Sequence, residues 1–529
     1  MIPSRAVTAA LLPALVLAPL PVAAAPAPDA LKQEAAAKVD AQAKLVQEMV
    51  DSVFSFAEPG FQEVETMRYL TGILEQHGFK VTRGVAGIPT AWTATWGSGG
   101  PLIALGSDVD GLLGLSQVPG SPKLKPMVEG APGHGEGHNA GMPLIVAAAI
   151  AAKEVMEKHH IPGRLMLWPG IAEELLGTKA FYVKAGLFKG VDACIFTHVS
   201  SDFSTGWGDL GSTALVSAEY TFHGKAAHAA AQPWEGRSAL DGVEVMDAAW
   251  NMRREHLPVT QRSHYIITNG GDQPNIVPET ASVWYYFRDL DFASVRALYE
   301  TGNTISEAAA KATGTTVEHH LLGYAAPTYG NRPIAEAAWK NIAAVGMPKW
   351  SADDQAFAKA VQTANARKLE PLRAEVTPLS TPATRERSLG GGSDDIGDVM
   401  WTVPTITIRF PSNIPNMIFH NPLSAIAMAT PIAHKGAMAG AKAVAMTTLD
   451  LVTTPALVAA AKSFQRDVQF KEQTYDPVLT DADKPATHLN TELMERMRPK
   501  MRGFYYDPAK HPTYLQQLGI KYPDVSGTK

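Results

Sequence analysis

A glycine-rich run at residues 133–139, GHGEGHN, carries an acid and an imidazole two positions apart, Glu136 and His138. Glycines permit backbone conformations that other residues resist, so both side chains can point into one cavity. Carboxylate oxygen and imidazole nitrogen suit a borderline divalent ion such as zinc. The run therefore predicts metal ligands, and the alternative is a flexible glycine loop that binds nothing.

A pair of adjacent glutamates, Glu173 and Glu174, follows the apolar run 165–171. Two neighbouring carboxylates at the end of a strand are costly unless a cation lies between them or one holds a proton. A metal ligand beside a general base explains the pair. The alternative is the solvated acidic start of a helix.

Three short apolar runs, 102–105, 165–171 and 191–197, predict buried strands of an α/β sheet. They lead into Asp108 and Asp110, into the glutamate pair, and into His198, respectively. In open α/β sheets, ligands bind at the carboxyl ends of the strands. The shared placement favours one functional site over three unrelated motifs.

The chain has 529 residues, of which 46% are hydrophobic and 19% charged, which predicts two or three globular domains. A net charge of -6 gives no basic surface of the kind that nucleic-acid binding needs. The single cysteine, Cys194, excludes an intramolecular disulfide and a cysteine-rich zinc site.

Residues 1–25 have the pattern of a secretory signal peptide: Arg5, an apolar core over 6–22, and small residues at 23–25. We therefore expect an exported protein, periplasmic or secreted. A membrane anchor is the alternative, but prolines interrupt the apolar stretch, at Pro13, Pro19 and Pro21. No second segment has the length of a membrane span.

From residue 213 the pattern becomes strand, helix, strand, strand, helix, strand, which predicts a ferredoxin-like α+β domain over 213–325. It is inserted into the larger domain, because further candidate residues, among them His420, appear only after it. The predicted catalytic domain thus comprises 30–212 and 326–475, including a long helix over 424–449. An extension over 476–529 contains tyrosines that predict packing against the body.

These motifs, in this order, resemble the zinc aminoacylase and carboxypeptidase G-type family of metallohydrolases. The chain is most similar to the amidohydrolase branch, which contains aminobenzoyl-glutamate hydrolases and auxin-conjugate hydrolases. The matching segments lie between about residues 41 and 451: 107–111, 133–139, 172–174, 197–198, 228, 275–288, 391–395 and 419–421. The resemblance implies a phosphorylase/hydrolase-like α/β catalytic domain with a mixed sheet, and an inserted lid domain that forms a homodimer.

The resemblance also implies two divalent metal ions, zinc first, with manganese or cobalt as alternatives. The positions that match ligands are Glu136, His138, Glu174, His198 and His420. Glu136 stands where this branch usually has a cysteine, so a hard carboxylate replaces a soft thiolate. This departure leaves open manganese, a looser zinc site, or a Glu136 that does not bind.

Among the remaining positions, Glu173 matches the general base and Asp110 a carboxylate behind the ligands, while Asp108 stands where other branches have a ligand histidine. His228 matches a lid histidine that reaches the partner's site and can stabilise an oxyanion. Substrate-binding positions also match, at Asn275, Arg288 and Gly391. The alternatives without a functional role are a core or surface histidine for His228 and an edge-strand charge for Arg288.

The implied activity is hydrolysis of an amide bond in N-acyl amino acids or related carboxylate-bearing substrates. An arginine fork binds a carboxylate through two hydrogen bonds, which fits such substrates. A dipeptidase or carboxypeptidase of the same fold is the main alternative. A binding protein that kept the scaffold without catalysis is less favoured, because Glu173 is present.

Overall fold

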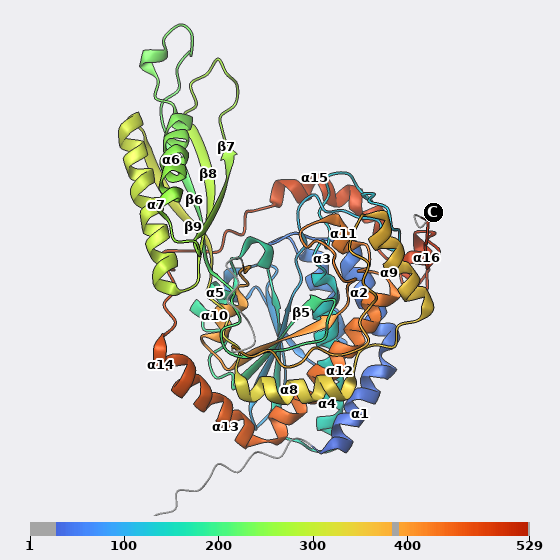
Figure 1. The fold of residues 1–529 in the computed structure, drawn as a ribbon. Coiled ribbons are helices and arrows are strands. Elements are labelled where there is room, and N and C mark those ends of the chain that lie inside the picture. Colours follow the sequence, from blue (N-terminus) through green and yellow to red (C-terminus); the bar gives the residue numbers. More distant parts are fainter. Residues whose placement is uncertain (1–27, 383–390, 527–529) are drawn as a thin grey trace, which may run out of the picture.

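The computed structural model describes residues 28–382 and 391–526, and the predicted signal peptide lies outside this part (Figure 1). Its main sheet has six strands, in the order β1 (Lys80–Arg83), β2 (Trp92–Ser98), β4 (Gly163–Gly170), β3 (Leu102–Asp108), β5 (Ala193–Ser200) and β10 (Thr405–Pro411). Strands β4, β3, β5 and β10 are parallel, whereas β2 is antiparallel to both its neighbours. The prediction of a mixed sheet is confirmed.

Apolar strands and helices build the core around this sheet. Helix α4 (Gly141–Lys158) packs against β3, β4 and α12 (Pro431–Thr453), and α12 also contacts α1 (Asp29–Ala41) and α8 (Arg332–Val345). The expectation that no second segment has the length of a membrane span is wrong, because residues 138–158 are long and apolar enough to cross a membrane. However, 89% of their most apolar window is buried inside the protein. This helix therefore forms part of the protein core.

The second sheet has four antiparallel strands in the order β7 (Arg262–Asn269), β8 (Thr280–Asp289), β6 (Ala214–His223) and β9 (Thr316–Ala325). Helices α6 (Ala239–Arg253) and α7 (Phe292–Thr313) pack on it. This is the ferredoxin-like lid that the alternation predicted, and it projects from the body (Figure 1).

The remaining helices surround the main sheet or connect to the lid. They are α2 (Ala43–Phe56), α3 (Val64–Gln76), α5 (Lys179–Lys184), α9 (Ala352–Ala364), α10 (Ile396–Met400), α11 (Pro422–Ala425), α13 (Pro455–Phe464), α14 (Phe470–Glu472), α15 (Thr491–Met501) and α16 (Tyr514–Gln517). The single helix predicted over 424–449 is wrong at its start, because the chain turns after α11 and α12 begins at Pro431.

The C-terminal segment packs against the body, as its aromatic residues predicted. Tyr506 and Tyr514 are buried, and Arg498 of α15 forms an ion pair with the fully buried Glu58. Glu58 also accepts hydrogen bonds from the backbone N–H groups of Glu65 and Thr66, at the start of α3. The segment therefore neutralises a buried carboxylate of the catalytic domain.

Candidate metal centre

The glycine-rich loop leads through a 3₁₀ turn, His138–Ala140, into α4, and this turn contacts the parallel strands β3 and β5. Gly137 has φ of 120°, and a Cβ there would lie 2.7 Å from the Met428 methyl group. Glycine is therefore required for the turn that brings His138 into the interior. His138 is 4% exposed.

Asp110, two residues beyond β3, orients this histidine. His138 Nδ1 lies 3.2 Å from the Asp110 carbonyl oxygen and 3.4 Å from its Oδ1. The other ring nitrogen, Nε2, is buried and has no hydrogen-bond partner, and it lies 3.5 Å from Glu136 Oε2. A buried nitrogen that faces a carboxylate without a hydrogen bond is what an imidazole ligand to a metal ion requires.

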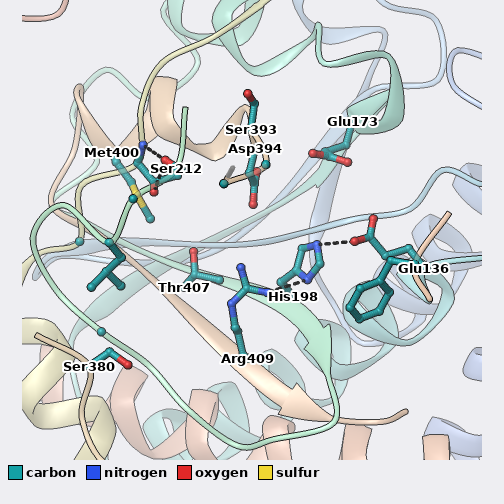
Figure 2. A pocket seen from close by; sticks show the side chains of 18 of the residues that line it. Glu136, Glu173, His198, Ser212, Ser380, Ser393, Asp394, Met400, Thr407 and Arg409 are labelled. Atoms are coloured by element: carbon teal, nitrogen blue, oxygen red, sulfur yellow. Dashed lines mark hydrogen bonds and ion pairs between the residues drawn. The ribbon is translucent and has the colours of Figure 1, made fainter. Parts of the chain in front are cut away.

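The two oxygens of Glu136 face different histidines. Oε1 lies 3.7 Å from His198 Nε2, an approach that Figure 2 shows, whereas Oε2 lies 3.5 Å from His138 Nε2 and 3.6 Å from His420 Nε2. A carboxylate with one oxygen on each side can bridge two ions. The Glu136 side chain thus occupies the centre of the candidate site.

The glutamate pair lies in a 3₁₀ turn after β4. Glu174 Oε2 is 3.3 Å from His420 Nε2, and the Glu174 N–H donates to Asp110 Oδ2 at 3.0 Å. Glu173 Oε2 lies 4.0 Å from His138 Nε2. Ligand atoms of Glu136, His138, Glu173 and Glu174 lie within 4.8 Å of one another, as do those of Glu136, His138 and His198.

Negative charge exceeds positive charge in this cluster. Burial raises the pKa of both Glu173 and Glu174 well above the usual value, and nearby carboxylates add to the effect. Burial opposes the charged form of His138, but Asp110 and Glu174 outweigh it and raise the pKa of His138. A bound cation would supply the missing positive charge, so the residues present fit divalent metal ions.

A cavity of about 680 Å³ opens over this cluster. Arg288 and Gly391 line it, and the Arg288 guanidinium donates to Ser393 Oγ at 2.7 Å. His228 and Asn275 are exposed on the lid and do not line it. The structure therefore places the five predicted ligands in one site together with Asp110, Glu173, Arg288 and Gly391. It leaves His228 and Asn275 outside the cavity.

A buried lysine that the sequence interpretation missed lies beside this site. Lys179, at the start of α5, is fully buried, and its Nζ contacts Asp108 Oδ1 at 2.6 Å and pairs with Asp395. The backbone N–H groups of Thr178 and Lys179 donate to Asp395 Oδ2 at 3.2 and 3.1 Å. Burial opposes the charge on Lys179, but the carboxylates of Asp108 and Asp395 raise its pKa well above the usual value.

Comparison with known proteins identifies the family. The chain is 32% identical over 462 residues to one of the subunits of p-aminobenzoyl-glutamate hydrolase from Escherichia coli (strain K12), covering 83% of this chain and 96% of that protein. The chain belongs to the M20 peptidase family. This confirms the resemblance on which the ligand assignments are based.

A further relative and a family model are consistent with this assignment to the M20 peptidase family. The mouse Xaa-Arg dipeptidase is 28% identical over 437 residues, covering 81% of this chain and 90% of that protein. Residues 210–314, from the start of the lid to the end of α7, match the peptidase dimerisation domain. The protein is thus a metal-dependent hydrolase of amide bonds.

Solved structures share the fold. A putative aminohydrolase from methicillin resistant Staphylococcus aureus has a TM-score of 0.55 at 18% identity, covering 80% of this chain and 100% of that chain. An aminobenzoyl-glutamate utilization protein from Klebsiella pneumoniae has a TM-score of 0.53 at 16% identity, covering 78% of this chain and 96% of that chain.

Proposed function

We propose that this M20 peptidase hydrolyses the amide bond of N-acyl amino acids or related carboxylate-bearing substrates, with two divalent ions and Glu173 as general base. The observation that carries the proposal is Glu136, whose two oxygens face His198 on one side and His138 with His420 on the other. Zinc is the first candidate metal, and the hard Glu136 carboxylate makes manganese or cobalt an alternative.

The cavity supports this chemistry. Bound divalent ions would lower the pKa of a water molecule and polarise the amide carbonyl. Glu173 is buried beside the ligand Glu174, where its carboxylate can accept the proton of the attacking water and return it to the leaving nitrogen. Asp110 contributes by fixing His138 and the Glu174 backbone.

Arg288 and the 391–393 backbone support recognition of the substrate carboxylate. The Arg288 guanidinium reaches the cavity from β8, and Ser393 Oγ holds one of its donors. The planar guanidinium can still offer donors to a carboxylate in fork geometry. Gly391 lines the cavity and packs closely on the Gly211 backbone, because a Cβ there would lie 2.1 Å from the Gly211 carbonyl oxygen.

We propose a homodimer through the lid, in which His228 and Asn275 reach the partner's cavity. The Ala229 N–H donates to the Asn275 carbonyl oxygen at 3.1 Å, which joins the two segments. His228 Nδ1 accepts from the N–H groups of Ala230 and Ala231, so its hydrogen is on Nε2, available to an oxyanion. The edge strand β7 leaves Ile266 60% exposed, which favours a partner there.

The relatives favour a dipeptidase as the second candidate, since Xaa-Arg dipeptidases match most of the chain. Export is supported by the residue pattern at 1–25 alone. N-terminal sequencing of the mature protein tests export: the proposal expects a start after about residue 25, and a mature protein that begins at Met1 would contradict it.

The function is tested with purified protein, loaded with zinc, manganese or cobalt, against a panel of N-acyl amino acids and dipeptides. We expect Glu173→Gln to lower kcat by about 10²–10⁴-fold without changing the metal content. Glu157→Gln, at an exposed position on α4, is the matched control. Undiminished hydrolysis by Glu173→Gln would contradict the assignment of the base, and a fully active monomer would remove His228 from the partner's site.

A further inference from the structure

Arg409 brings a positive charge into the cavity without a direct ion pair to a described carboxylate. It lies on β10, where the parallel register pairs it with His198 of β5, and its side chain is exposed toward the cavity (Figure 2). Across the described ranges 28–382 and 391–526, no carboxylate oxygen lies within 4.0 Å of its guanidinium. Among the described residues, its side chain contacts His198, with Nη1 3.3 Å from Nδ1.

That contact cannot satisfy the guanidinium. His198 Nδ1 lies 2.9 Å from the Val199 carbonyl oxygen, to which it donates a hydrogen bond. The unprotonated Nε2 then faces Glu136, as a metal ligand must. Two N–H donors therefore face each other at Arg409, and the exposed guanidinium, which has five donors and no acceptor, can offer the remaining donors to water or to a ligand in the cavity.

The surroundings of Arg409 fit an anionic oxygen group. Thr407, two positions earlier on β10, lies on the same face of the strand, and Ser204 and Ser380 also line this part of the cavity. Figure 2 shows Thr407 next to the Arg409 guanidinium, with Ser380 farther away on another segment. The carboxylate in this region, Asp202, is already bonded to Ser200 and to Thr377.

The cavity thus holds two arginines from different domains, Arg288 of the lid and Arg409 of the catalytic domain. We infer that Arg409, with the hydroxyl group of Thr407, binds a second carboxylate of the substrate, separate from the one at Arg288. The preferred substrates are then dicarboxylates. The inference takes its reaction from the proposed amide hydrolysis and adds the substrate class.

Two matched substrate pairs test it, each comparing a carboxylate with its neutral amide. N-acetylglutamate and N-acetylglutamine place the second group on the amino-acid side, whereas N-succinylalanine and N-succinamoylalanine place it on the acyl side. We expect the acid of at least one pair to be hydrolysed with a kcat/KM about 10-fold or more above its amide, as charge-assisted bonds to arginine allow.

Arg409→Gln should reduce that ratio to about 2-fold or less, because the variant lacks the charge that distinguishes the acid from its amide. Arg409→Lys should keep part of the preference, since it retains charge but not the fork. Arg466→Gln, at an exposed arginine paired with its neighbour Asp467, is the matched control. Absence of acid preference in both pairs, or equal slowing of acid and amide by Arg409→Gln, would overturn the inference.

A binding measurement separates this inference from the proposed function. Calorimetry with glutarate and its monoamide, glutaramate, should show about 10-fold tighter binding of glutarate to the wild type, and no difference in Arg409→Gln. That result without hydrolysis of any of the four substrates would support the subsite and contradict the proposed function. Equal binding of the two compounds to the wild type would overturn the subsite, whatever the hydrolytic result.

Discussion

Removing the buried charge of Lys179 should strongly destabilise the catalytic domain. Its ammonium group is fully buried between Asp108 and Asp395, in a space where even a Cβ at Gly170 would lie 1.8 Å from Asp108 Oδ1. Lys179→Met keeps much of the volume of the side chain but leaves both carboxylates without their cation.

The magnitude follows from the burial of the partners. Asp108 and Asp395 are 1% and 0% exposed, so water cannot replace the ammonium group without rearrangement. Breaking a buried ion pair by removing one partner costs about 3–5 kcal/mol. About 1 kcal/mol shifts the Tm of a domain of about 150–250 residues by about 2–4 °C, and the shift is smaller for a larger domain such as this one, so we expect a decrease of about 5–10 °C.

Thermal and urea unfolding of the wild type and variant measure this loss. Lys462→Met removes an exposed ion pair with Asp192, and should cost at most about 1 kcal/mol. Adding Asp108→Asn to Lys179→Met should restore part of the loss, because one uncompensated charge disappears. A Lys179→Met protein whose free energy of unfolding lies within about 1 kcal/mol of the wild type would refute the reasoning.

Three further predictions concern other parts of the chain. Glu136→Cys should shift the metal preference from manganese toward zinc, measured by competitive metal binding, because thiolate is the softer ligand. Asp354→Asn should lower the free energy of unfolding by about 1–3 kcal/mol at pH 7. Burial opposes the ionised form of Asp354, but Lys435 and other hydrogen-bond donors lower its pKa below 3.8. The difference in stability should therefore disappear as the pH falls through the folded-state pKa of Asp354, and a difference that stays constant with pH would contradict this prediction. Arg498→Met should lower the Tm by leaving the buried Glu58 carboxylate without its cation, and an unchanged Tm would show that the C-terminal segment does not stabilise the body.

The strands could be predicted because their signals are local, whereas the full set of candidate ligands, His420 in particular, came from the family resemblance. Buried parallel strands read as continuous apolar runs, and their carboxyl ends must meet at one edge of the sheet. The sequence interpretation thus placed 102–105, 165–171 and 191–197 in the sheet, which the structure confirms. The lid followed from alternating strand and helix patterns, which the structure also confirms.

The errors and omissions have identifiable causes. The helix predicted over 424–449 begins at Pro431, where proline at the first helical position was the missed signal. Lys179 could not be recognised, because its partners are 71 and 216 residues away in the sequence. Arg409 had a local signal, since strand alternation places it on the same face as Thr407, but no pattern identifies that face as a cavity wall.

Metal binding is the most direct test of the central claim, that Glu136, His138, Glu174, His198 and His420 hold two divalent ions. A crystal soaked with manganese or zinc should show two anomalous difference peaks, one on each side of the Glu136 carboxylate. These peaks should come with two bound ions per chain in solution. A fully active protein whose anomalous density lies away from these five residues would contradict the account.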